Sequence, residues 1–162
     1  RNLVNEFSSF ARFPSANPEP CELPPIIEET VALYREGHPN IKFEIANTSD
    51  IPPLNLDRQQ IKQALINLVE NAIGAIKDEG VVSFVVSHDP ILKRIRLEAA
   101  DTGSGISNEV KTRLFEPNFS TKKSGMGLGL TIVSTIIADH NGVISVQDNV
   151  PQGAKFVIEL PV

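Results

Sequence analysis

Two glycine clusters bracket the stretch of the chain whose residue types best suit binding of an anionic ligand. The first cluster, residues 101–106 (DTGSGI), follows an alternating run that predicts a strand. The second, residues 125–130 (GMGLGL), continues into an apolar segment that predicts a buried helix. Free backbone N–H groups and roughly half a positive charge of helix dipole lie at a helix N-terminus. The second cluster therefore predicts a phosphate site.

Neither cluster fits the commoner glycine-rich nucleotide loops. A Walker loop needs a Gly-Lys pair before Ser or Thr, and the chain contains no Gly-Lys pair. A dinucleotide fingerprint needs a third glycine three residues after the second, where this chain has Asn108 and Leu130. Glycines that merely turn the chain are the alternative. Two clusters around a polar loop, the first headed by a carboxylate, favour a ligand site instead.

A pair of asparagines, Asn67 and Asn71, lies on the longest predicted helix, residues 57–77. Asparagine is a poor helix former, and the pair lies off the apolar stripe of that helix. The alternative is an exposed pair without a role. We favour amide oxygens that reach a hydrated Mg²⁺, which takes a few protein oxygens besides phosphates and water. The apolar stripe itself consists of Ile61, Leu65, Leu68, Ala72 and Ile76.

The elements that must position these residues follow from periodicity and from capping signals. Pro25 starts one helix and Asp57 is the N-cap of the longest one. The helices that we expect to cover one face of a mixed sheet are 24–36, 57–77 and 129–140. The remaining expected elements are strands 41–45, 81–87, 93–100, 143–147 and 154–160, and a short helical turn at 108–115. This order predicts a two-layer α/β sandwich.

The first residues of the chain predict a separate unit. Leu3, Phe7 and Phe10 form a helical stripe in residues 1–13, and the proline-rich segment 15–25 predicts a stiff linker. A helix that packs on its own domain is the alternative, but the prolines favour the end of a longer coiled-coil or bundle helix. We therefore divide the chain into residues 1–21, the helix end with its linker, and residues 22–162, the main domain.

Composition narrows the class of protein. With 162 residues and 41% apolar content, the chain has enough residues for one domain with a single core. A formal net charge of −5 argues against a nucleic-acid partner. The single cysteine, Cys21, cannot form an intrachain disulfide, which favours a cytoplasmic setting. No apolar run approaches the about 20 residues of a membrane span, although a parent protein could still be membrane-anchored.

Four ordered motifs resemble the ATP-binding domain of sensor histidine kinases, within the superfamily that includes gyrase, the Hsp90 chaperones and MutL. NLVENA (67–72) resembles the N box, DTGSGI (101–106) the G1 box, LFEPNFSTK (114–122) the F box and GMGLGL (125–130) the G2 box. The resemblance covers about residues 22–162 and implies a Bergerat-type fold. The opening NEFSSFARFP resembles the end of the dimerising hairpin in nitrogen-regulation sensors of the NtrY type.

The resemblance implies ATP and Mg²⁺ as ligands and assigns roles to individual residues. Asn71 resembles the Mg²⁺-binding asparagine, and Asn67 would assist at the phosphates. Asp101 resembles the acceptor of the adenine amine. Lys122 would neutralise charge on the γ-phosphate, so that Asn67, Asn71 and Lys122 form the expected catalytic group. The other implied nucleotide contacts are Gly103, Gly105, Ile106, Thr121, Gly125, Met126, Gly127, Leu128, Gly129 and Leu130.

Three positions depart from the family pattern. Asn118 replaces the usual F-box aromatic, and Gly74 lies where many members have a basic residue. Asn67 occupies the position at which gyrase-like hydrolases carry a general-base glutamate. The last difference favours phosphoryl transfer to another group over efficient hydrolysis of ATP.

The resemblance implies that the domain transfers the γ-phosphoryl group of ATP to a histidine on a dimerisation hairpin, for relay to a response regulator, in a homodimeric parent. We interpret His38, His88 and His140 as structural, so the acceptor histidine would lie outside this sequence. The alternatives are a Ser/Thr protein kinase or ATPase of the same superfamily, and an interaction module with an empty pocket.

Overall fold

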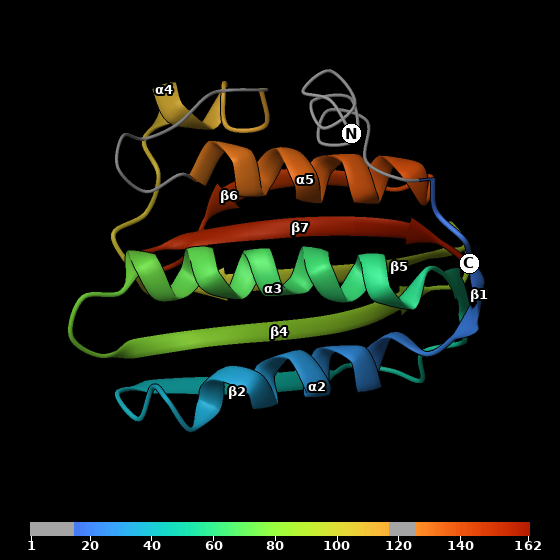
Figure 1. Cartoon of the computed structure of the whole chain (residues 1–162), viewed down its shortest axis with the longest axis horizontal. Helices are drawn as coiled ribbons and strands as arrows, with labels where there is room; N and C mark the ends of the chain where they lie inside the picture. The colour runs from blue at the N-terminus through green and yellow to red at the C-terminus, as the bar shows by residue number, and fades with distance from the viewer. Residues whose placement is uncertain (1–14, 117–125) are drawn as a thin grey trace, which may run out of the picture.

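A five-stranded sheet covered on one face by helices forms the body of the protein (Figure 1). The computed structural model describes residues 15–116 and 126–162. The strand order is β2-β4-β5-β7-β6, with β2 parallel to β4 and the other neighbours antiparallel. The mixed two-layer α/β sandwich predicted from the sequence is confirmed. The strands are β2 (Ile41–Asn47), β4 (Gly80–Asp89), β5 (Arg94–Asp101), β6 (Val143–Asp148) and β7 (Ala154–Pro161).

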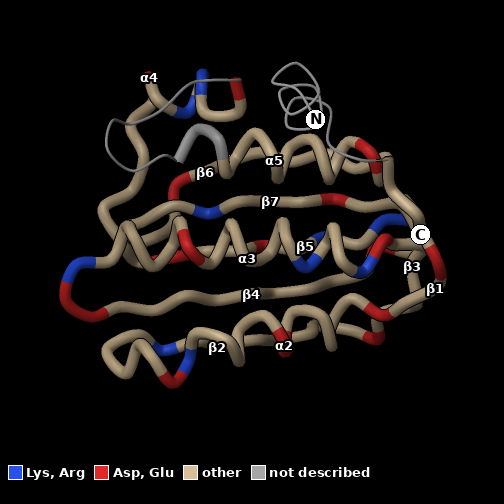
Figure 2. Tube along the Cα trace, viewed as in Figure 1, with Lys and Arg blue, Asp and Glu red and all other residues tan. Residues whose placement is uncertain are grey.

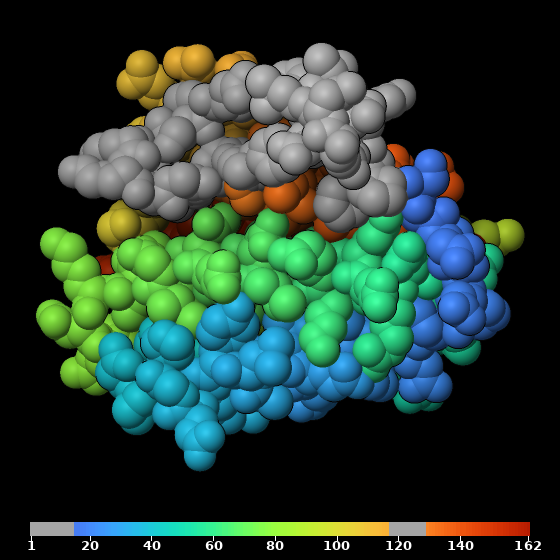
Figure 3. All heavy atoms as spheres, in the orientation of Figure 1, coloured from blue at the N-terminus to red at the C-terminus, as the bar shows by residue number. Residues whose placement is uncertain are grey.

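Three long helices cover the sheet, and α3 lies between the other two (Figure 1). They are α2 (Leu23–Arg35), α3 (Arg58–Ala75) and α5 (Met126–Asp139); the single turn α4 (Asn108–Lys111) follows β5. The predicted N-cap is confirmed, since an oxygen of Asp57 accepts from the backbone N–H of Gln60 at 3.1 Å. In the space-filling view, α2 and α3 form a continuous surface (Figure 3).

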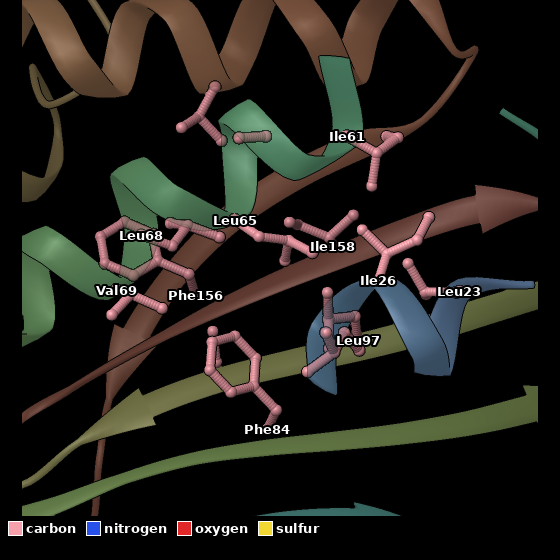
Figure 4. Packing of buried hydrophobic residues seen from close by; sticks show 14 of the residues in the cluster. Leu23, Ile26, Ile61, Leu65, Leu68, Val69, Phe84, Leu97, Phe156 and Ile158 are labelled. Carbon is pink, nitrogen blue, oxygen red and sulfur yellow. The ribbon is translucent and has the colours of Figure 1, made fainter. Parts of the chain in front are cut away.

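The predicted apolar stripe of α3 faces the sheet, as all five of its members are buried. Leu65 and Leu68 point toward Phe156 and Ile158 of β7, with Phe84 of β4 close by (Figure 4). These side chains come from segments far apart in the sequence, so their burial holds the helix layer on the sheet. The position of α3, and of every polar residue on it, is set by this packing.

Two short strands were not predicted from the sequence. β1 (Glu19–Cys21) pairs antiparallel with β3 (Leu54–Leu56) in a separate two-stranded sheet. Three residues of the segment predicted as a linker therefore pair with the body of the protein. Strands of three residues are too short to show a period, and the prolines around them favour a loop. The predicted N-terminal helix and Asn118 lie outside the described residues.

The sheet face opposite the helices carries a ladder of ion pairs. Arg96 lies 2.8 Å from Glu98 and 3.7 Å from Glu159, and Lys155 lies 3.6 Å from Glu98. Lys and Arg are interspersed with Asp and Glu over the described chain (Figure 2). Such half-exposed pairs add little stability, but they keep this face hydrated and leave the helix-covered side as the place for a core.

Candidate functional site

A cavity of about 280 Å³ opens where the C-terminal part of α3 meets the end of β5 and the start of β7. Asn71 and Gly74 of α3 form one wall. Asp101, Gly105 and Ile106 of the first glycine cluster form another. Two polar residues thirty positions apart in the sequence, Asn71 and Asp101, therefore share one cavity.

Asp101 is a recessed acceptor at this site, with 5% of its surface exposed. Its Oδ1 accepts from the backbone N–H of Gly103 at 2.8 Å and of Ala154 at 3.4 Å. Burial raises the pKa of Asp101, and these two backbone donors partly oppose that rise. Both donors reach Oδ1, so among the described residues Oδ2 is the oxygen left for a ligand that donates. A buried carboxylate favours an amine donor over a carbonyl group.

The turn between β6 and β7 holds the backbone of Asp101 in place. The sequence did not predict this contact. Asn149 Nδ2 donates to the Asp101 carbonyl oxygen at 2.7 Å, and Gln152 Nε2 donates to that of Thr102 at 2.9 Å. Gly153 has φ +109, and a Cβ there would lie 1.8 Å from the same Asp101 oxygen. The sequence contained one signal for this contact, a glycine in a predicted turn.

Gly103 joins the first glycine cluster to the end of α3. A Cβ on Gly103 would lie 2.4 Å from the carbonyl oxygen of Ala75, and the Ser104 N–H donates to that oxygen at 3.0 Å. Within the described part of the chain, Gly105, with φ +81, lines the cavity, whereas Gly103 is not in its wall. The close approach at Gly103 sets the distance between the wall that carries Asn71 and the wall that carries Asp101.

Asn71 lines the cavity and has an amide nitrogen that lacks a hydrogen-bond partner among the described residues. Its Nδ2 is buried and, among residues 15–116 and 126–162, has no hydrogen-bond partner. A buried polar atom without a partner points to a ligand that completes it. An amide fits a Mg-bound phosphate, because its oxygen is a hard ligand for Mg²⁺ and its nitrogen donates to phosphate oxygens. The described residues contain no cluster of three His, Cys, Asp or Glu side chains suited to a metal.

Asn67, one turn before Asn71, hydrogen bonds α3 to α5 through its amide. Its Nδ2 donates to the Gly129 carbonyl oxygen at 3.1 Å, and its Oδ1 accepts from Gln63 at 2.9 Å. Leu130 is fully buried in the core, so its side chain packs there and a role at the nucleotide would fall to its backbone. α5 begins at Met126, which confirms that the second glycine cluster opens a helix.

Part of the predicted nucleotide site lies outside the described residues. Thr121, Lys122 and Gly125 lie outside the described residues, and of Met126, Gly127 and Leu128 the structure describes only their place in the first turn of α5. Their assigned roles remain predictions.

Glu70, which lies within the NLVENA motif but was assigned no role, and Phe156 also line the cavity. The Tyr34 hydroxyl donates to Glu70 Oε2 at 2.8 Å. Burial, together with this carboxylate, raises the pKa of Tyr34 to about 12. Phe156 is an inward-facing residue of β7, and its ring adds an apolar surface beside Asp101. Only the strand register brings it there.

Residues 56–162 match the family model described as the histidine kinase-, DNA gyrase B- and HSP90-like ATPases. The chain belongs to this family. The four motifs on which the sequence resemblance depended all lie within the matched range, so that resemblance is confirmed.

Curated relatives of the chain are longer proteins. The chain is 36% identical to the nitrogen regulation protein NtrY of Azorhizobium caulinodans over 98% of this chain and 21% of that protein. It is 37% identical to the sensor protein FixL of Bradyrhizobium diazoefficiens over 84% of this chain and 28% of that protein. The chain thus spans between a fifth and a third of the length of these relatives.

Solved structures of histidine kinases share the fold. The catalytic domain of the histidine kinase ThkA superposes with a TM-score of 0.81 at 33% identity, over 90% of this chain and 95% of that one. Full-length ShkA in complex with AMPPNP gives a TM-score of 0.82 at 30% identity, over 98% of this chain and 35% of that one. ThkA in complex with the response regulator TrrA gives a TM-score of 0.81 at 30% identity, over 98% of this chain and 46% of that one. This chain has the architecture of a histidine kinase catalytic domain.

Proposed function

We propose that the cavity binds Mg-ATP and that the domain transfers the γ-phosphoryl group to a histidine on a dimerisation hairpin. The observation that carries the proposal is the placement of Asn71 and Asp101 on two walls of one cavity. The ShkA structure with AMPPNP and the ThkA structure with a response regulator support it by similarity.

Each wall would serve one part of the nucleotide. Oδ2 of Asp101 would accept from the exocyclic amine of adenine, while Ile106 and Phe156 pack against the base. Asn71 would bind the phosphate end. Mg²⁺, when bound, would neutralise charge on the phosphates and so help ADP to leave. Lys122 would add a second positive charge there.

The residue at position 67 favours transfer over hydrolysis. An amide cannot take a proton from an attacking water, and both ends of the Asn67 amide are already hydrogen bonded. The acceptor would therefore be a group that another part of the protein brings to the site. In the parent, we propose a homodimer whose phosphohistidine passes its phosphoryl group to a response regulator.

A cytoplasmic location belongs to the same proposal, for a parent that is either free or anchored in a membrane. Among the described residues, no helix combines the length and apolar character that crossing a bilayer requires.

Calorimetric titration with ATP and GTP, with and without Mg²⁺, tests the nucleotide site. Asp101→Ala should lose the preference for ATP, a loss of about 10- to 150-fold, because a hydrogen bond to a charged group contributes about 1.5–3 kcal/mol. Asn71→Ala should lose the part of the affinity that depends on Mg²⁺. Asn47→Ala, on strand β2 and away from the cavity, is the matched control. Unchanged affinity in both site variants would refute the site.

Phosphoryl transfer is tested separately, with the full-length parent protein and labelled ATP. Phosphohistidine is labile in acid, whereas phosphoserine and phosphothreonine are stable. Acid-stable label would favour the Ser/Thr protein kinase alternative, and release of phosphate without labelled protein would favour the ATPase alternative.

A further inference from the structure

Three segments meet at the end of α3 that lies away from the cavity. The backbone N–H of Asn17 donates to Asp57 Oδ2 at 2.9 Å, and the backbone N–H of Asp57 donates to His140 Nε2 at 3.0 Å. Since a backbone N–H can only donate, Nε2 is the acceptor, and Nδ1 carries the proton that it donates to the Ile136 oxygen at 2.8 Å. His140 is buried, with 6% exposed. These bonds connect the proline-rich segment to α3 and α5.

The same two helices are joined a second time beside the cavity. There Asn67 of α3 donates to the Gly129 carbonyl oxygen near the start of α5. α3 and α5 pack along their length (Figure 1). A packed helix moves as a rigid element, so a shift of α5 at His140 also moves Gly129. Asn67 is one helical turn from Asn71, so such a shift reaches the cavity wall.

We propose that the hydrogen-bonded series Asn17–Asp57–His140 couples the position of the proline-rich segment to nucleotide affinity, with His140 as the positioning residue that sets α5 against α3. The segment is suited to this role, because Pro18 and Pro20 flank Glu19 and β1 holds its far end against β3. The ligand in this inference is the Mg-ATP of the proposed function. Coupling is reciprocal, so Mg-ATP must also strengthen the bond between Asn17 and Asp57.

The first test removes one backbone donor from an exposed residue. Asn17→Pro deletes the N–H that Asp57 accepts, whereas Asn17→Ala keeps it and serves as the matched control. We expect about fivefold weaker Mg-ATP binding for Asn17→Pro and wild-type affinity for Asn17→Ala, as one hydrogen bond is lost. Equal affinities of the two variants would overturn the coupling.

The second test separates the two hydrogen bonds of His140. His140→Gln keeps an acceptor near the position of Nε2, and His140→Asn keeps a donor near Nδ1 but loses the acceptor for Asp57. Asn17→Pro should weaken binding in the His140→Gln background and have no further effect in the His140→Asn background. An effect of equal size in both backgrounds would overturn the role of His140. Since Asn17 is exposed, the first test decides even if a His140 variant does not fold.

Amide hydrogen exchange supplies a readout that a merely structural contact would not change. Saturating Mg-ATP should slow exchange of the Asn17 N–H about fivefold in the wild type and leave it unchanged in His140→Asn. An Asn17 exchange rate that ignores the nucleotide would overturn the coupling while leaving the proposed function intact. Failure of the wild type to bind Mg-ATP at all would instead overturn the proposed function and, with it, this inference.

Discussion

Replacing Gly153 by alanine is the sharpest test of how the cavity is built. The new Cβ would lie 1.8 Å from the Asp101 carbonyl oxygen and 3.0 Å from the Thr102 Cα, and the backbone there has φ +109. Such a conformation costs a non-glycine residue about 1–3 kcal/mol. The contact is with backbone, so no side-chain rotation relieves it.

The turn must therefore move, and its hydrogen bonds weaken. Two are at stake: Asn149 N–H to the Gly153 oxygen at 2.9 Å, and Asn149 Nδ2 to the Asp101 oxygen at 2.7 Å. At about 1 kcal/mol each, the free energy of unfolding should fall by about 3–5 kcal/mol in total. For a domain of this size, this corresponds to a fall in melting temperature of about 6–20 °C.

Urea denaturation followed by circular dichroism measures the loss, and ATP titration measures its effect on the site. Gly37→Ala is the control, because a Cβ at Gly37 meets nothing within 4 Å and its φ is not positive. We expect that control to stay within about 1 kcal/mol of the wild type. A loss below about 1 kcal/mol for Gly153→Ala, with ATP affinity intact, would refute the idea that this turn braces Asp101.

Three further changes have expected outcomes. Asp101→Asn should raise the free energy of unfolding at neutral pH, because burial raises the pKa of Asp101 and disfavours its ionised form. This gain in stability should be absent below the ordinary pKa of 3.8 and appear as the pH rises past it. A gain that stays constant across melting curves recorded at a series of pH values would contradict the prediction. Leu65→Ala should lower the free energy of unfolding in urea by about 2–5 kcal/mol, against less than about 0.5 for exposed Leu33→Ala. Gly74→Ala should raise the free energy of unfolding by about 0.5–1 kcal/mol, and with it the melting temperature, because its Cβ would enter open space on a helix. A lower melting temperature would count against that geometry.

Features that depend on neighbouring residues were readable from the sequence. The apolar stripe of α3, its Asp57 cap and the start of α5 within a glycine cluster all follow from residues within a few positions of one another. Strand alternation likewise predicted five of the seven strands that residues 15–116 and 126–162 form. The two that were missed, β1 and β3, contain three residues each, which is too few to show a period.

The tertiary structure alone decided how these pieces converge. Asn71 and Asp101 share a cavity because Gly103 packs against the end of α3, and the turn at Gly153 holds Asp101 from the other side. The contact of His140 with Asp57 spans 83 positions. A sequence states the local preferences of each segment through its periodicity. The packing of whole elements decides which carbonyl group lies against a glycine and which N–H donates to an imidazole.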